Sequence, residues 1–157
     1  MAANNDPPLI SAVYAKDIVE CRRLIDTGEA NVNGDRGHHS WTALHWASLR
    51  GYLEISELLT SSGADVNIRS SGYTALHHAS IYGSLEIVQL LLCQGADMSI
   101  RTINRRTALD WASYNGHLTV ADCLRKWPWT MAIIALKEDL AVYHLLDAST
   151  LIDLWQY

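Results

Sequence analysis

The sequence predicts an all-α repeat solenoid, in which pairs of antiparallel helices stack along one axis and short turns join one pair to the next. One stretch recurs in three strong copies: TALHWASLRGYLEISELLTSSGADVN at 42–67, TALHHASIYGSLEIVQLLLCQGADMS at 74–99 and TALDWASYNGHLTVADCL at 107–124. A looser first copy begins at Pro7. Equivalent leucines lie 35, 32 and 33 residues apart, at Leu9, Leu44, Leu76 and Leu109. A step of this size indicates stacked structural repeats.

The pattern within one copy predicts two helices. Leu44 and Ala47 are three residues apart, which places them on one face of a first helix. Gly51 is suited to end that helix, because glycine readily adopts the left-handed conformation. The apolar residues of LEISELL then form one side of a second helix, and Gly63 ends it. One such pair cannot bury its apolar face alone, so neighbouring pairs are expected to share a continuous core.

The period divides the chain into parts. Residues 1–6 are predicted to be a flexible N-terminus, and 7–127 to hold four repeats, at about 7–37, 38–70, 71–103 and 104–127. Repeat one lacks the Thr and His of TALH and is expected to cap the stack with a solvated outer face. Residues 128–157 are predicted to form a helical C-terminal cap, made of a degenerate fifth repeat and a terminal helix from Ser149. The alternative is that this last helix docks a second protein.

The motif TALHWAS, followed by GYLEI-x-ELL and GADVN, resembles the ankyrin repeat over about Pro7 to Lys126. The resemblance implies a stack of helix-turn-helix units with β-hairpin-like turns, and a module that binds another protein without catalysis. It also implies that His45 and His77 of TALH bond the backbone of neighbouring turns. Fold alone does not identify the partner.

In this family the residues that flank the turns and those late in the first helices line one concave face. The resemblance carries the partner-binding role to Trp41, Arg50, Arg69, Tyr73, Ile81, Tyr82, Arg101, Arg106, Tyr114 and His39. Trp41, Tyr73 and Arg106 each stand directly before the repeat's Thr, so we expect them to form a row. Trp, Tyr and Arg are the residue types enriched at interface hot spots. Tyr82 and Tyr114 could instead pack against neighbouring turns, whereas Trp46 and Trp111 are predicted to belong to the core.

The charge pattern favours a protein partner with acidic groups. The net charge is −5, yet arginines gather near the turns and first helices. Arginine forms forked hydrogen bonds with carboxylates. The alternatives are an adaptor whose C-terminal helix docks a second protein, and a nucleotide or RNA that stacks on Trp41, Tyr73 and Tyr82. The net negative charge and the lack of a Lys-rich stripe argue against nucleic acid.

Nothing in the sequence predicts an enzyme, a metal or a cofactor. There is no G-x-S-x-G motif or phosphate loop, Asp110 has no partner group, and the pair His38 and His39 has no further ligand nearby. No apolar run reaches the ~18 residues of a membrane span. We expect a monomer, with Cys21, Cys93 and Cys123 as buried, reduced thiols in the cytoplasm or nucleus.

Asn67 allows two interpretations. Leu59, followed six residues later by Asp65-Val66-Asn67, resembles the context in which an oxygen-sensing hydroxylase modifies asparagines of ankyrin hairpins. The simpler interpretation, which we prefer, is that the Asn67 side chain forms hydrogen bonds within its own turn.

Overall fold

The computed structural model describes residues 6–37 and 40–128. His39, the predicted fifth repeat and the terminal helix from Ser149 lie outside the described residues, so the predictions for them are not tested here.

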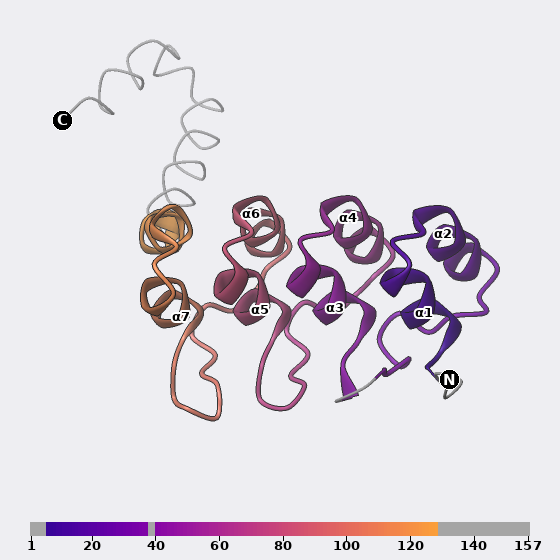
Figure 1. The fold of residues 1–157 in the computed structure, drawn as a ribbon, viewed down its shortest axis with the longest axis horizontal. Helices are drawn as coiled ribbons and strands as arrows, with labels where there is room; N and C mark the ends of the chain where they lie inside the picture. Colours follow the sequence, from indigo (N-terminus) through magenta and orange to yellow (C-terminus); the bar gives the residue numbers. More distant parts are fainter. Residues whose placement is uncertain (1–5, 38–39, 129–157) are drawn as a thin grey trace, which may run out of the picture. The chain divides into compact units, whose positions relative to one another are not determined.

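The described helices form two rows, and this arrangement confirms the predicted all-α repeat solenoid (Figure 1). The inner row consists of α1 (Pro8–Tyr14), α3 (Ala43–Arg50), α5 (Ala75–Tyr82) and α7 (Ala108–Tyr114). The outer row consists of α2 (Ile18–Asp26), α4 (Leu53–Ser61) and α6 (Leu85–Cys93), and a further helical stretch covers 118–128. Hairpin-like connections extend beyond the inner row, on the side away from the outer helices (Figure 1).

The Thr and His of the two TALH motifs cap the inner helices α3 and α5 and also join neighbouring repeats. The Nδ1 atom of His45 accepts the backbone N–H of Thr42 at 3.3 Å, and its Nε2 atom lies 3.2 Å from the carbonyl oxygen of Tyr73 in the next repeat. His77 repeats the arrangement with Thr74 at 3.2 Å and the Ile100 carbonyl at 3.1 Å. The expectation that these histidines bond neighbouring turn backbone is therefore confirmed.

A second link between repeats comes from the asparagines of the turns. The Asn33 amide donates to the Gly63 carbonyl at 2.9 Å and accepts the N–H of Asp65 at 2.8 Å. Asn67 forms the same pair of bonds one repeat later, with the Gly95 carbonyl and the Asp97 N–H. The Asn67 backbone N–H donates to the Asp65 carboxylate within its own turn at 2.9 Å, but the Asn67 side chain bonds the next repeat's turn, so the expectation is wrong for the side chain.

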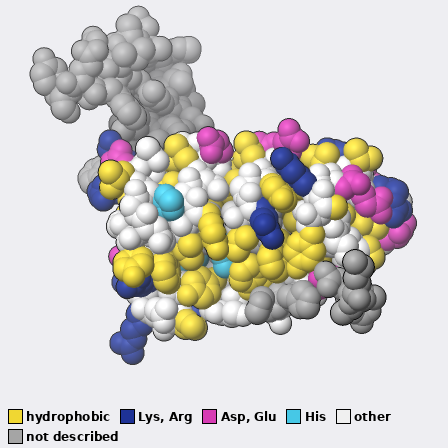
Figure 2. Space-filling model, in the orientation of Figure 1, with side chains coloured by type: hydrophobic (Ala, Val, Ile, Leu, Met, Phe, Trp, Pro, Cys, Tyr) yellow, Lys and Arg dark blue, Asp and Glu magenta, His cyan; other side chains and the backbone are white. Residues whose placement is uncertain are grey.

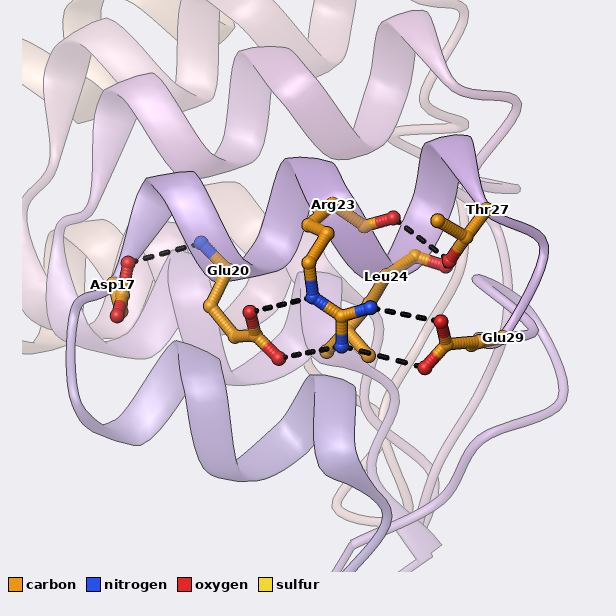
Figure 3. A network of polar contacts seen from close by, with 6 residues as sticks. All are labelled: Asp17, Glu20, Arg23, Leu24, Thr27 and Glu29. Atoms are coloured by element: carbon orange, nitrogen blue, oxygen red, sulfur yellow. Dashed lines mark hydrogen bonds and ion pairs between the residues drawn. The ribbon is translucent and has the colours of Figure 1, made fainter.

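Repeat one has the solvated outer face expected of a terminal repeat. The Arg23 guanidinium on α2 lies 2.8 Å from a carboxylate oxygen of Glu20 and 2.8 Å from one of Glu29, all at the surface (Figure 3). Asp17 caps the start of α2 by accepting the Glu20 N–H at 3.0 Å.

The core lies between the two rows and is lined mainly by Leu, Ile, Val and Ala. Cys21 is fully buried in it, as predicted. The prediction of a buried thiol is wrong for Cys93, which is exposed, and Cys123 is half-buried. Cys93 follows the buried Leu91 by two positions in α6, which turns its side chain to the opposite side of the helix.

Candidate functional site

An apolar groove crosses three repeats between the inner helices and the hairpins. Its volume is about 540 Å³. Figure 2 shows a band of hydrophobic side chains across this face of the molecule, at the level of the inner helices. The groove is lined by Trp41, Trp46, Leu49, Ser71, Tyr73, His78, Ile81, Tyr82 and Trp111.

Tight turns place Trp41 and Tyr73, which stand directly before Thr42 and Thr74, at the edge of this groove. The Ser70 N–H donates to the Tyr73 carbonyl at 2.8 Å, and Ser71 and Gly72 between them have φ of 51° and 84°. Glycine suits such a position, because it adopts positive φ without steric cost. In the flanking hairpins the Trp41 carbonyl accepts the Gly37 N–H and the Arg106 carbonyl accepts the Thr102 N–H, each at 2.9 Å.

A second row of aromatic residues lies on the inner helices, at the fifth position of each TAL motif. This row consists of Trp46, His78 and Trp111. Trp41 and Tyr73, which lie on the hairpins, each contact two members of this second row. Trp41 lies between the rings of Trp46 and His78, with ring centroids 4.6 and 4.3 Å away. Tyr73 lies between His78 and Trp111, at 5.6 and 6.1 Å.

Arg106 continues the series at the position where Trp41 and Tyr73 stand in repeats two and three. Its guanidinium carbon lies 4.9 Å from the centroid of the Trp111 ring and 4.2 Å from that of Tyr114. Both distances are typical of cation–π contacts. We call the interleaved series Trp46, Trp41, His78, Tyr73, Trp111 and Arg106 the aromatic ladder.

The ladder is uncharged along its length except at Arg106. Burial, with a smaller effect from the nearby His45 and His77, lowers the pKa of His78 to about 3, so the ring is neutral at neutral pH. The side chain is 4% exposed, and its Nε2 atom has no hydrogen-bond partner within the described part of the chain. The side chains around the groove are more accessible: Tyr82 is 57% exposed and Tyr114 is 69% exposed.

The structure brings together part of the predicted binding surface. Trp41, Tyr73, Ile81 and Tyr82 line the groove, and Arg106 and Tyr114 lie at its α7 end. Arg50 is exposed at the end of α3. Arg69 and Arg101 do not line the groove, because their guanidinium groups donate to the carbonyls of Arg101 at 3.1 Å and Arg105 at 2.9 Å.

Sequence reasoning missed three groove residues. Trp46 and Trp111 were predicted to be core residues, yet both are half-buried and line the groove, as does His78. The inner helices have apolar side chains on two faces, one toward the core and one toward the groove. A helical period alone does not separate these faces, whereas the three bulky rings at one motif position could have indicated the second row.

Asp110 and Asn67 are both occupied by structural hydrogen bonds. The Asp110 carboxylate accepts the N–H of Thr107 at 2.8 Å and its hydroxyl at 2.9 Å, and these bonds hold the pKa of Asp110 below its usual value. Both polar atoms of the Asn67 amide bond the next turn. Hydroxylation of Asn67 stays a prediction, to be tested by mass spectrometry of the cell-derived chain, in which an unchanged mass for the Asn67 peptide would contradict it.

Within residues 6–37 and 40–128, no three His, Cys, Asp or Glu side chains are grouped as a metal site would require. None of the helices in these ranges has the length and apolar character needed to cross a membrane.

Comparison with known proteins agrees with the repeat pattern. A family model of ankyrin repeats in three copies matches over residues 1–70, 40–102 and 69–128. The chain is 38% identical over 63 residues to human palmitoyltransferase ZDHHC17, and 37% identical over 60 residues to human ankyrin repeat domain-containing protein 40. These matches cover 40% and 38% of this chain, but only 10% and 16% of those relatives. Mouse 2-5A-dependent ribonuclease is 38% identical over 65 residues, which are 41% of this chain and 9% of that protein.

Proposed function

Because this chain belongs to the ankyrin repeat family, whose repeats generally mediate protein–protein interactions, we propose that it is a non-catalytic module that binds a segment of another protein in the groove. The observation that supports this proposal is the aromatic ladder, which leaves an apolar groove of about 540 Å³ open across three repeats. Aromatic side chains and arginine dominate the energetics of many protein interfaces.

The rigidity of the groove favours tight binding of a flexible segment. Every ladder ring except Trp46, at its end, contacts two other ladder residues, and the hairpins that hold Trp41 and Tyr73 are closed by backbone hydrogen bonds. A preformed site loses little conformational entropy when the ligand binds. We propose that the chain acts as a monomer in the cytoplasm or nucleus, where an exposed thiol such as Cys93 stays reduced.

Site-specific photo-crosslinking in cells tests this function. One variant carries p-benzoylphenylalanine in place of Tyr82 in the groove, and its control carries it in place of Val19 on α2, where the side chain is 76% exposed. We expect the Tyr82 variant to crosslink a discrete segment of a partner protein, identified by mass spectrometry. Adding Tyr73→Ala is expected to abolish that product while the far-UV circular dichroism spectrum is retained.

Two results would contradict the proposal. Equal crosslinking to the same segments from the Val19 position would mean that the groove is not selective. Crosslinking of Tyr82 to nucleic acid alone, lost steeply as salt is raised, would favour the stacking alternative instead.

A further inference from the structure

We infer that the bound segment has a bulky apolar side chain close in sequence to an acidic residue, and that Arg106 binds the carboxylate of that residue. This inference rests on the proposed function and specifies the chemistry of the partner.

Arg106 differs from Arg36, Arg69 and Arg101 in how its guanidinium is used. Arg36, Arg69 and Arg101 all donate hydrogen bonds to oxygen atoms of their own or a neighbouring hairpin. The Arg106 guanidinium lies against two rings, and within the described ranges it has neither a hydrogen-bond acceptor nor a paired carboxylate. Its N–H donors are therefore available to a ligand.

Contacts with two rings restrict the Arg106 side chain. Its guanidinium carbon lies over the rings of Trp111 and Tyr114, whose planes are 89° apart. The N–H donors lie in the guanidinium plane, and their fork matches the two oxygens of a carboxylate. Because the rings already restrict the side chain, less rotamer entropy is lost when the carboxylate binds.

The charges around the α7 end of the groove favour an anionic group over a cationic one. The groove lining contains no Asp, Glu, Lys or Arg, and its histidine is neutral at neutral pH. Arg101 and Arg106 both act on Asp110, where they help to lower the pKa of a carboxylate that is already bonded to Thr107. Asp110 is not within ion-pair distance of Arg106, so the guanidinium charge is not neutralised there.

The position of Trp111 sets the spacing within the segment. This ring lines the groove and also supports Arg106, whose guanidinium carbon is 4.9 Å from the ring centroid. An apolar side chain in the groove and a carboxylate on Arg106 would thus lie on neighbouring parts of one ring. Since consecutive Cα atoms are about 3.8 Å apart, the two residues are expected within about three positions of each other.

Selection from a random peptide library displayed on phage, with the full chain immobilised, tests the inference. We expect the selected peptides to combine Trp, Phe or Leu with a nearby Asp or Glu. Synthetic forms are then measured by fluorescence anisotropy. Arg106→Gln is expected to weaken binding about tenfold or more, and changing the peptide's acidic residue to its amide should have the same effect.

Three controls make the result specific. The amide peptide is expected to bind wild type and Arg106→Gln equally, because the interaction has already been removed. Arg106→Lys should restore only part of the affinity, since an ammonium lacks the planar fork. Arg22→Gln removes the same charge from the exposed surface of α2 and is expected to leave affinity unchanged.

Different results would contradict the carboxylate inference alone and the proposed function as a whole. Peptides that need Tyr73 but contain no acidic residue, or that bind Arg106→Gln as well as wild type, would overturn the carboxylate inference and leave the groove as the binding site. Enrichment of Lys-containing or quaternary ammonium peptides would overturn it in favour of cation binding by the rings. Failure to select any peptide that depends on Tyr73 would overturn both this inference and the proposed function.

Discussion

Lowering the pH from 7 to 5 is expected to destabilise the repeat stack, because buried histidines resist protonation in the folded chain. The pKa of His45 is lowered to about 4 and that of His78 to about 3, and the pKa of His77 is also lowered, with burial as the main cause in each. The charged groups that influence these rings act in the same direction. Arg36 contributes to the lowered pKa of His45, and Arg69 to that of His77.

The size of the effect follows from proton linkage. A histidine in the unfolded chain titrates near pH 6.5, so its stabilising effect is fully present above that pH and is lost between pH 6.5 and the folded pKa. At pH 5 the solution is about 1.5 pH units below the unfolded value, which corresponds to about 2 kcal/mol for each of His45 and His78. A loss of about 4 kcal/mol is a large part of the 5–15 kcal/mol by which domains are usually stable.

The carboxylates of the described residues whose pKa values are lowered do not account for a loss between pH 7 and 5. The pKa values of Glu20, Glu29, Asp97 and Asp110 are lowered in the folded chain, chiefly by side-chain or backbone hydrogen bonds. Their stabilising effect is therefore present above their ordinary values near 4 and is lost only at lower pH.

Urea unfolding followed by far-UV circular dichroism at pH 7, 6 and 5 measures the effect. His78→Phe keeps a ring in the ladder but cannot titrate, so it is expected to remove about half of the loss between pH 7 and 5. Equal stability at pH 7 and 5, or an undiminished loss in His78→Phe, would refute the reasoning.

Three other perturbations test separate parts of the structure. Asn67→Ala removes both hydrogen bonds to the next turn and is expected to lower the free energy of unfolding by about 1–2 kcal/mol in urea titrations, whereas no change would show that the turns are not coupled. Gly83→Ala is expected to lower the free energy of unfolding, measured by urea titration, more than Gly63→Ala does. Both glycines have positive φ, at 75° and 86°, but of the two only Gly83 would place the added methyl group against the next repeat, 2.5 Å from the His117 ring. Cys93 is expected to react with a thiol reagent in the native chain much faster than Cys21, whose pKa burial raises to about 11; equal rates would contradict the burial pattern.

The helix pairs could be predicted from the sequence because the same local signals recur in each copy. Thr42 and His45 cap an inner helix, Gly51 ends it, and the next apolar run forms the outer helix. The row of residues before each Thr was also predictable, because a fixed period places equivalent residues side by side. Trp41 and Tyr73 accordingly line one groove.

Contacts between repeats were harder to predict. Asn67 has the composition of a residue that stabilises its own turn, and only the stacked structure brings it to Gly95 and Asp97. Trp46 and Trp111 have the spacing of core residues, but they lie beside a groove that exists only once the hairpins are in place. Arg69 and Arg101 have the positive charge expected of a site for acidic groups, but their guanidinium groups donate hydrogen bonds to hairpin carbonyls.

Fluorine NMR of chain labelled with 5-fluorotryptophan tests most directly whether the groove is the binding surface. The signals of Trp41, Trp46 and Trp111, assigned by single Trp→Phe variants, are followed as a library-selected peptide is added. We predict that these three signals shift together, with a midpoint equal to the Kd from anisotropy. Saturating peptide that leaves all three signals in place would contradict the proposal that the aromatic ladder binds the partner.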